Sequence, residues 1–270
     1  MDTSLALDAV RAYWDCKKSD RPESHIGMSA LGHCGRQLAY KYHEIPGNPY
    51  DWRAKIIFDD GHLHHDQIRK ALAEGLVLMN SCYSLVKEEE QVSLGYVTGH
   101  IDGMLEHDDI KCENKEHRDL LLEVKSMNDR GFNELKKTGE LSKEYAIQTS
   151  AYMRATGVSG ALILAKNKNS GEMLQLLYNG DSDLLDQRLR VLYDVHKSGQ
   201  PEDVLREYGP NAAGVLPWNC GYCPFVRLCW RDNGLVQKAE HKFELTQKFV
   251  VDLHNCNTKD VKASKQEPKS

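Results

Sequence analysis

The sequence predicts an α/β protein, and three observations lead to that class. The run Leu120–Val124 is apolar and ends in a β-branched residue, as buried strands do. A second apolar run over Ala161–Lys166 has the same character, and a segment with helical periodicity, Lys143–Ala155, lies between them. The 270 residues are enough for one large domain, or for a domain with an additional lobe, and can bury a substantial core.

The N-terminal part of the chain is predicted to be helical. Apolar residues at helical spacing predict a helix over residues 4–16, and the polar stretch 17–27 predicts a loop. Ser29 has the chemistry of an N-cap, so we expect a helix over Ala30–His43. A run of proline, glycine and asparagine follows it and should end the helix.

A third helix is predicted around a histidine-rich turn, starting near Phe58 and running to Leu72. His62 and His65 are three positions apart and share a helix face, with His64 between them. The turn therefore offers a candidate metal ligand. The alternative interpretation is a polar surface that carries several histidines.

The sequence at the centre of the chain predicts a pair of strands that carry charged side chains. Residues 76–98 predict strands that lead into Gly99–Gly103, which carries Asp102. The charged stretch 107–119 is expected to be the tip of a hairpin, and the run that starts at Leu120 forms its second strand. We therefore expect Asp102 to lie close to this second strand.

That second strand ends in a Glu-x-Lys pattern. Residues i and i+2 of a strand face the same side, so Glu123 and Lys125 should project together. Two carboxylates and an ammonium at neighbouring strands suit a divalent-metal site, because Mg²⁺ prefers oxygen ligands. The alternative is an exposed hairpin with solvated charges.

The second half of the chain continues with alternating helices and strands. The helix over Lys143–Ala155 carries Gln148 and Tyr152 on one face and ends at Gly157. The other predicted elements are a partly helical connector over 128–139, a strand over 161–166 paired with one over 173–178, and an amphipathic helix over 181–198.

Composition and charge narrow the function classes. The net charge is −5, whereas many proteins that coat nucleic acids have an excess of basic residues. A negative net charge is compatible with an enzyme that has an acidic metal site, because the bound metal neutralises part of that charge. We find neither an apolar run of membrane-spanning length nor a secretory signal, and so expect a cytoplasmic protein without membrane contact. In that compartment the eight cysteines should be thiols or metal ligands rather than disulfides.

The most specific local pattern is Cys220-x2-Cys223-x5-Cys229. Three thiols within ten positions fit a soft-metal site, which would need a fourth ligand. The candidates for that ligand are Cys16, Cys34, Cys82, Cys112 and Cys256. Four thiolates suit either structural zinc or an iron–sulfur cluster. The alternatives are buried apolar cysteines or a redox-active Cys-x2-Cys pair.

Six motifs occur in the order that one enzyme family shows. In this sequence they are Cys34-Gly35-Arg36, Gly61 to His65, Gly99 to Asp102, Glu123-x-Lys125, Gln148-x3-Tyr152 and Cys220-x2-Cys223-x5-Cys229. Together they resemble the RecB-like branch of the PD-(D/E)xK nuclease superfamily. The resemblance is greater to its iron–sulfur members, which include four-cysteine exonucleases linked to CRISPR adaptation and the nuclease domains of helicase–nuclease machines. Ile101 stands where the superfamily name has proline, and no phosphate-loop motif of a helicase motor occurs.

The resemblance implies a role for each matched residue. The implied catalytic residues are Asp102, Glu123, Lys125, Gln148 and Tyr152. The implied ligands of Mg²⁺ or Mn²⁺ are His65, Asp102, Glu123 and the Val124 carbonyl, with His62 and His64 competing for the histidine role. The implied [4Fe–4S] ligands are Cys34, Cys220, Cys223 and Cys229, and the implied nucleic-acid contacts are Arg36, Tyr152 and Lys166.

The resemblance also implies an architecture and a function. We expect a restriction-endonuclease-like core with a mixed central sheet flanked by helices, and an N-terminal helical part joined to a C-terminal lobe by the cluster. The expected regions are helical 1–80, core 81–200, cysteine lobe 201–240, and a C-terminal helix and tail 241–270. The implied activity is metal-dependent exonuclease action on single-stranded DNA or DNA ends. A homo-oligomer and partners from recombination, replication or CRISPR adaptation are compatible with it. The alternatives are a silent nuclease fold that binds nucleic acid or docks proteins, and a zinc-stapled protein.

Overall fold

The computed structural model describes residues 5–17, 26–108, 111 and 118–245. The chain packs as two units. Unit 1 comprises Met1–His33 and Tyr50–Tyr193, and unit 2 comprises Cys34–Pro49 and Asp194–Ser270. The region boundaries predicted at residues 80, 200 and 240 stay predictions, and most of the predicted C-terminal helix and tail lies outside the described residues.

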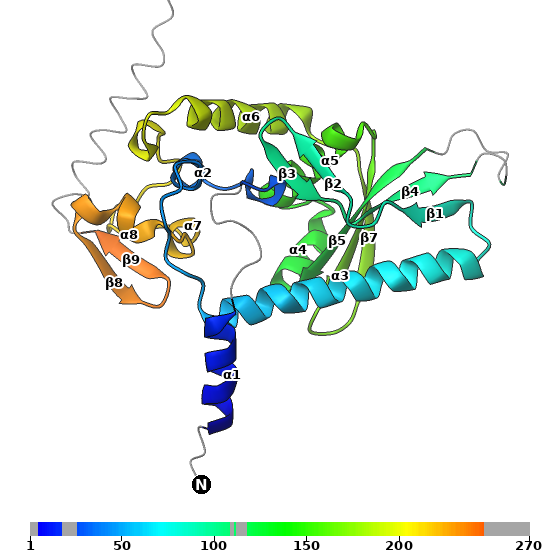
Figure 1. Ribbon diagram of the computed structural model, residues 1–270, viewed down its shortest axis with the longest axis horizontal. Helices are drawn as coiled ribbons and strands as arrows, with labels where there is room; N and C mark the ends of the chain where they lie inside the picture. Colours follow the sequence, from blue (N-terminus) through cyan, green and yellow to red (C-terminus); the bar gives the residue numbers. More distant parts are fainter. Residues whose placement is uncertain (1–4, 18–25, 109–110, 112–117, 246–270) are drawn as a thin grey trace, which may run out of the picture. The chain divides into compact units, whose positions relative to one another are not determined.

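Unit 1 contains a mixed five-stranded sheet with the order β1-β4-β5-β6-β7 (Figure 1). Its strands are β1 (Tyr83–Val86), β4 (Gly103–His107), β5 (Leu120–Met127), β6 (Ala161–Asn167) and β7 (Met173–Tyr178). β5 and β6 are parallel, and the other neighbours are antiparallel. The prediction of an α/β protein with a mixed central sheet is therefore confirmed.

The strand predicted over Gly99–Gly103 is divided in two. β2 (Gln91–Leu94) and β3 (Val97–His100) form a separate hairpin, while β4 begins at Gly103 and belongs to the central sheet. Asp102 therefore lies at a junction, where the chain leaves one sheet and enters the other.

Helices cover both faces of the central sheet. On one face, Ile68 of α3 (Trp52–Leu78) packs against Leu122 and Val124 of β5. On the other face, α4 (Asp129–Thr138) packs Phe132 against Met127. Helix α5 (Lys143–Thr156) lies on this second face and α6 (Ser182–Lys197) follows β7, both close to their predicted bounds. Because side chains alternate along a strand, this packing assigns the odd-numbered positions of β5 to the face of α4 and α5.

The N-terminal helices differ in part from the prediction. α1 (Leu5–Cys16) is confirmed, but Ser29 lies inside a short 3₁₀ helix, η1 (Met28–Ala30). The following helix α2 begins only at Gly35, with Cys34 at its N-cap position, and ends at Tyr42. The prediction of an N-cap at Ser29 was wrong because the tight 3₁₀ turn and four non-helical residues precede the helix, a detail that side-chain chemistry alone does not signal.

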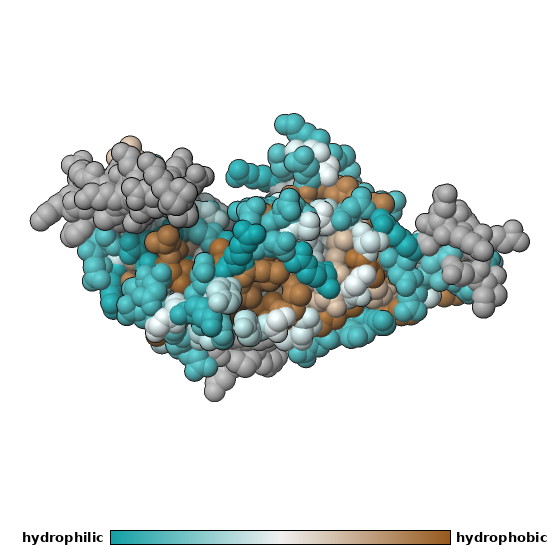
Figure 2. Space-filling model, turned by 90° about the horizontal axis from the view of Figure 1, so that it is seen from above, coloured by the Kyte–Doolittle hydropathy of each residue, from teal (hydrophilic) through white to brown (hydrophobic). Residues whose placement is uncertain are grey.

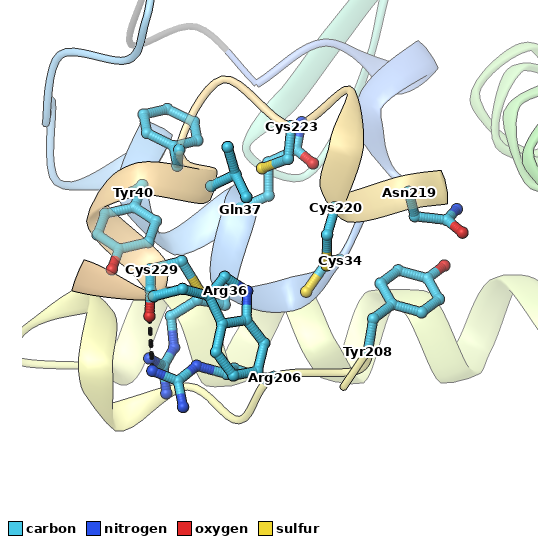
Figure 3. A pocket seen from close by; sticks show the side chains of 13 residues that line it. Cys34, Arg36, Gln37, Tyr40, Arg206, Tyr208, Asn219, Cys220, Cys223 and Cys229 are labelled. Atoms are coloured by element: carbon cyan, nitrogen blue, oxygen red, sulfur yellow. Dashed lines mark hydrogen bonds between the residues drawn. The ribbon is translucent and has the colours of Figure 1, made fainter. Parts of the chain in front are cut away.

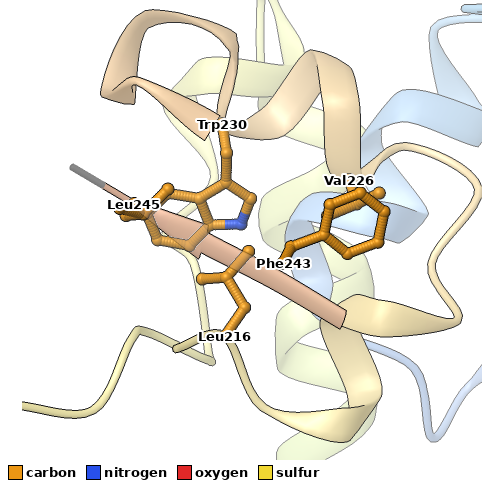
Figure 4. Close-up of a cluster of buried hydrophobic side chains, with 5 residues drawn as sticks. All are labelled: Leu216, Val226, Trp230, Phe243 and Leu245. Atoms are coloured by element: carbon orange, nitrogen blue, oxygen red, sulfur yellow. The ribbon is translucent and has the colours of Figure 1, made fainter. Parts of the chain in front are cut away.

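Unit 2 is built from short elements around its own core. These elements are α2 (Gly35–Tyr42), η2 (Pro201–Asp203), α7 (Trp218–Gly221), α8 (Val226–Cys229), η3 (Arg231–Asn233), β8 (Leu235–Ala239) and β9 (Lys242–Leu245). The core consists of Leu216, Val226, Trp230, Phe243 and Leu245 (Figure 4). Cys220, Cys223 and Cys229 pack against this core, so the cysteine motif is part of the interior framework of the unit.

The surface is mainly hydrophilic on the face drawn in Figure 2, with hydrophobic residues reaching it in several patches. Within the described ranges, no helix combines the length and the apolar character that a bilayer crossing requires.

Candidate active site

Two carboxylates face each other where β4 begins beside β5. Gly103 of β4 pairs with Leu122 of β5, so the next facing positions are Asp102 and Glu123. β4 begins here, and the chain before it belongs to the separate β2–β3 hairpin. The edge of β5 beyond this point is therefore free of β4 and open to side chains, and the two sequence-predicted carboxylates meet there. We call this place, with Asp102, Glu123 and the backbone of Val124, the fork.

The backbone of Val124 is part of the same fork. Its N–H donates to Asp102 Oδ2 over 2.7 Å, which replaces the strand pairing that β4 no longer provides. In a strand, the N–H and C=O of one residue point to the same edge, so the Val124 carbonyl also faces the fork. This orientation is the one that its predicted role as a metal ligand requires.

Lys125 lies beside Glu123, as the i, i+2 spacing predicted. Its Nζ donates to Glu123 Oε1 and, over 3.0 Å, to Gln148 Oε1. The ammonium also lies 4.6 Å from the centre of the Tyr145 ring. Lys125 thereby bridges β5 to helix α5, and its position is fixed from three sides.

Gln148 and Tyr152 extend the site along α5. Tyr152 is buried and forms a side-chain hydrogen bond with Gln148. Burial raises the pKa of Tyr152 to about 12, so the phenol stays protonated. A Cβ at Gly99 would lie only 2.6 Å from the Tyr152 hydroxyl oxygen, so the absence of a side chain at Gly99 makes room for this residue.

His65 is the histidine that reaches the carboxylates. Its Nδ1 lies 3.0 Å from Asp102 Oδ1. His64 instead contacts Lys166, with 3.3 Å between its Nδ1 and the lysine Nζ, and His62 is exposed. Of the three histidines, His65 is therefore the neighbour of Asp102, and its role as a metal ligand stays a prediction.

The charges of the fork influence one another. Burial alone would raise the pKa of Asp102, but the hydrogen bond and charge of His65 and the Val124 N–H together hold it below its ordinary value. Burial raises the pKa of Glu123, which is only 2% exposed, and Lys125 opposes this effect. The carboxylate of Glu123 in turn holds the pKa of Lys125 above its ordinary value against the effect of burial.

The donor set of the fork fits a hard divalent cation. Glu123 Oε2 is buried and has no hydrogen-bond partner, so one carboxylate oxygen is left for a further ligand. Within the described residues, no three His, Cys, Asp or Glu side chains are grouped so as to hold a metal ion by themselves. Mg²⁺ usually takes only one or two protein carboxylates and completes its shell with water and phosphate oxygens, so Asp102 and Glu123 suffice.

Arg69 is a neighbour of the site that sequence reasoning missed. It lies one helical turn after His65 and is buried, and its guanidinium donates to Glu89 and Asp66. Asp102 is among the charges that raise its pKa. The i, i+4 spacing from His65 is a signal that could have identified it.

The two predicted basic nucleic-acid contacts have different surroundings. Lys166 is half-buried and donates to Gln67 Oε1 over 2.8 Å, beside His64. Arg36 belongs to unit 2, is only 8% exposed, and donates to the backbone carbonyls of Val204 and Glu202. A buried guanidinium committed to two carbonyls ties α2 to η2, so the geometry gives Arg36 a structural role instead of the predicted contact.

The four predicted cluster cysteines line one pocket of unit 2 (Figure 3). Cys34 comes from the start of α2, and Cys220, Cys223 and Cys229 come from the α7–α8 segment. Burial raises the pKa of Cys220 and of Cys223 to about 12, so these thiols would ionise only beside a cation. Sulfur donors fit zinc or an iron–sulfur cluster, although the described cysteines are not drawn together into a ready-made metal cage.

The remaining four cysteines of the sequence are Cys16, Cys82, Cys112 and Cys256. Cys16 is a free, exposed thiol. Cys82 is disulfide-bonded, so the expectation that the cysteines are thiols or metal ligands was wrong for this residue. Cys112 and Cys256 lie outside the described residues.

Comparison with known proteins gives weak structural likenesses. No family model and no curated protein matches the sequence. The crystal structure of SSO0001 is 14% identical with a TM-score of 0.44, covering 85% of this chain and 96% of that one. An alkaline exonuclease, LHK-Exo, from Laribacter hongkongensis is 12% identical with a TM-score of 0.42, covering 70% and 90%. A phage-related exonuclease from Haemophilus somnus 129PT is 14% identical with a TM-score of 0.39, covering 66% and 93%. Likenesses of this size leave the function to be argued from the geometry of the site.

Proposed function

We propose that unit 1 is a metal-dependent nuclease that hydrolyses phosphodiester bonds of DNA. The observation that carries the proposal is the fork between β4 and β5. There Asp102 and Glu123 occupy facing positions and Lys125 contacts Glu123. Exonuclease action on single strands or DNA ends is the finer part of the proposal and follows from the family resemblance of the six motifs.

Each residue of the fork has a task in this proposal. Asp102 and Glu123 would hold Mg²⁺ or Mn²⁺, and the Val124 carbonyl faces the same space. A bound cation of this kind supplies a water of lowered pKa and a positive charge beside the leaving oxygen. His65 orients the Asp102 carboxylate through its hydrogen bond, which also favours the ionised form of that carboxylate.

Lys125 is the candidate for handling the attacking water. Its Nζ is fixed between Glu123 and Gln148, so one N–H is left to orient a water or a phosphate oxygen. Gln148 forms hydrogen bonds with both Lys125 and Tyr152, and so connects helix α5 to the residues of the fork. Lys166 supplies a further cation. It lies on the face of the sheet that packs against α3, opposite to the face of Lys125, and we expect it to contact a phosphate of the DNA backbone.

The test uses isosteric changes of the two groups with the clearest tasks. Asp102→Asn and Lys125→Met should each reduce degradation of end-labelled DNA, in Mg²⁺ or Mn²⁺, at least about 100-fold, the usual scale for such groups. Glu172→Gln is the control, because Glu172 is an exposed carboxylate paired with Lys136 on the surface. Circular dichroism and thermal melting check that every variant is folded.

The outcomes separate the proposal from its alternative. If Asp102→Asn and Lys125→Met both digest DNA at the parent rate, the assignment of the site is wrong. If the folded parent protein binds DNA but cuts neither single nor double strands in either metal, the silent binding or docking module replaces the nuclease. The position of the label and the size of the products report end-directed or internal cutting.

We infer further that Cys34, Cys220, Cys223 and Cys229 hold a [4Fe–4S] cluster with a structural role. Four sulfur donors lining one pocket support a soft-metal centre, and the motif spacing resembles the iron–sulfur branch of the family. Anaerobic purification should give a brown protein with a broad visible absorption that Cys223→Ala loses. A colourless preparation with stoichiometric zinc would replace the cluster by structural zinc.

A further inference from the structure

An aromatic ladder lies on the surface of unit 2, separate from its buried core. Trp218 is 71% exposed and Tyr222 is 52% exposed, whereas Trp230 and Phe243 of the same unit are buried. The Trp218 and Tyr222 ring centres are 5.0 Å apart, and the two rings are tilted by 45° to each other. The ring of His241 stacks on Tyr222 with centres 4.1 Å apart and an interplanar angle of 15°. Large aromatic rings exposed as a group are uncommon on a surface without a binding role.

The ladder is held in place by the core beneath it. Leu216, two residues before Trp218, and Phe243, two residues after His241, both belong to the core cluster. His241 Nδ1 lies 3.2 Å from the Gly221 carbonyl oxygen, which joins the β8–β9 turn to α7. The backbone segments that carry the rings are therefore held in place before any ligand arrives, which reduces the entropy cost of binding.

The backbone around the ladder supports the same arrangement. His241 has a φ of 56°, a left-handed conformation that is uncommon outside glycine. A Cβ at Gly221 would clash with the His241 carbonyl oxygen, so glycine is needed where the two segments touch. These two features bring the imidazole ring against Tyr222.

We propose that Trp218, Tyr222 and His241 form a stacking platform for unpaired bases of single-stranded DNA. Every base has a flat aromatic face, so a ladder of rings binds single strands with little sequence preference. Lys242 follows His241 and is exposed, so it can meet a backbone phosphate, and the nearby acid Glu240 lies 3.8 Å from His241 Nε2. The choice of DNA as the ligand rests on the proposed nuclease function, while the platform itself rests on unit 2 alone.

Binding is measured without cleavage, on the full chain carrying Asp102→Asn and without added Mg²⁺ or Mn²⁺, so that the metal of unit 2 is left in place. The probe is oligothymidylate, which has little structure of its own, and the readouts are anisotropy of a labelled strand and tryptophan emission. Trp218→Ala and Tyr222→Ala should each weaken binding about five- to 150-fold, the range that corresponds to ~1–3 kcal/mol per stacked base. Trp218→Phe should retain most of the binding but lose most of the change in emission, because phenylalanine still stacks.

Tyr13→Ala is the matched control, since Tyr13 is an exposed aromatic residue on α1 in unit 1. If both alanine variants melt like the parent and bind oligothymidylate as tightly as it does, the proposal is overturned. That result is also the one expected if the rings hold a protein partner. Weakened binding by the variants of a protein that never cuts DNA would support the platform while refuting the nuclease. If the protein cuts DNA but the Trp218→Ala and Tyr222→Ala variants bind it as tightly as the parent, the nuclease proposal is supported and the platform is refuted.

Discussion

Gly99 matters at the residue scale because a neighbour occupies the space of its missing side chain. The Tyr152 ring and hydroxyl lie where a Cβ would stand, at 2.7 and 2.6 Å from that position. Tyr152 in turn bonds Gln148, which holds Lys125. One glycine outside the charged cluster therefore sets how closely α5 can approach the fork.

We predict that Gly99→Ala lowers DNA hydrolysis about ten- to 100-fold by displacing Tyr152, because small misplacements at a site are costly. The variant should still fold, since the clash involves the end of a side chain on one helix. Cleavage rates at saturating metal, compared with Tyr152→Phe, provide the measurement. An unchanged rate for Gly99→Ala would mean that Tyr152 is not needed in its observed position.

Arg36 and Lys166 show how the same residue type can differ in its surroundings. Both were predicted to contact nucleic acid from motif position or local charge. Arg36 is committed to two carbonyls in unit 2, whereas Lys166 contacts side chains of α3 near the sheet. Burial and partner identity, which decide this difference, depend on residues far away in the sequence.

At the scale of elements, a glycine at the end of a helix and a glycine inside a helix differ in what their backbone conformation requires. Gly157 is the C-cap residue of α5, with φ of +77°, while Gly75 lies within α3. A Cβ at either glycine would contact nothing within 4 Å. The same substitution to alanine therefore tests the backbone alone.

We predict opposite changes in stability for these two substitutions. Gly157→Ala should lower the free energy of unfolding by about 1 kcal/mol, because alanine is strained in the left-handed region. Gly75→Ala should raise it by about 0.5–1 kcal/mol, because alanine restricts the unfolded chain and favours the helix. Urea denaturation of the two variants provides the measurement, and equal signs would contradict the assigned helix end.

The sheet fork is the element that makes the site. A strand that continued past Asp102 in pairing with β5 would consume the Val124 N–H and cover its carbonyl. The chain before Asp102 instead belongs to the β2–β3 hairpin, and the side chain of Asp102 accepts the hydrogen bond from the Val124 N–H. The geometry of the candidate site therefore follows from an interruption of regular structure.

At the scale of the whole molecule, the two units divide the predicted tasks. The fork with its carboxylates lies within unit 1, and the four pocket cysteines lie within unit 2. The chain enters unit 2 at Cys34, leaves it after Pro49, and returns at Asp194. A metal that joined Cys34 to the later cysteines would close a very long loop, which removes unfolded-state entropy.

We predict that Cys223→Ala, or removal of the metal by a chelator, destabilises unit 2 selectively. Amide hydrogen exchange should accelerate in peptides from residues 34–49 and 194–245, because the sulfur ligands pack against the core of that unit. Peptides from the β5–β6 region of unit 1 should exchange as before. Cys16→Ala is the control, since Cys16 is free and exposed. Unchanged exchange in unit 2 would contradict a structural metal.

The sequence by itself determined most of the elements and the chemistry they carry. Apolar runs and β-branched residues identified the strands, Gly157 marked a helix end, and the i, i+2 rule brought Glu123 and Lys125 to one side. These features are local, because strand and helix periods relate residues that are close in the chain.

Only the tertiary structure decided which distant residues meet. It divided the strand at Asp102, selected His65 among three histidines, and buried the guanidinium of Arg36. It also gathered the cysteines in one pocket and left a ladder of rings on the surface. Such contacts depend on packing between segments far apart in the chain, which no local period encodes.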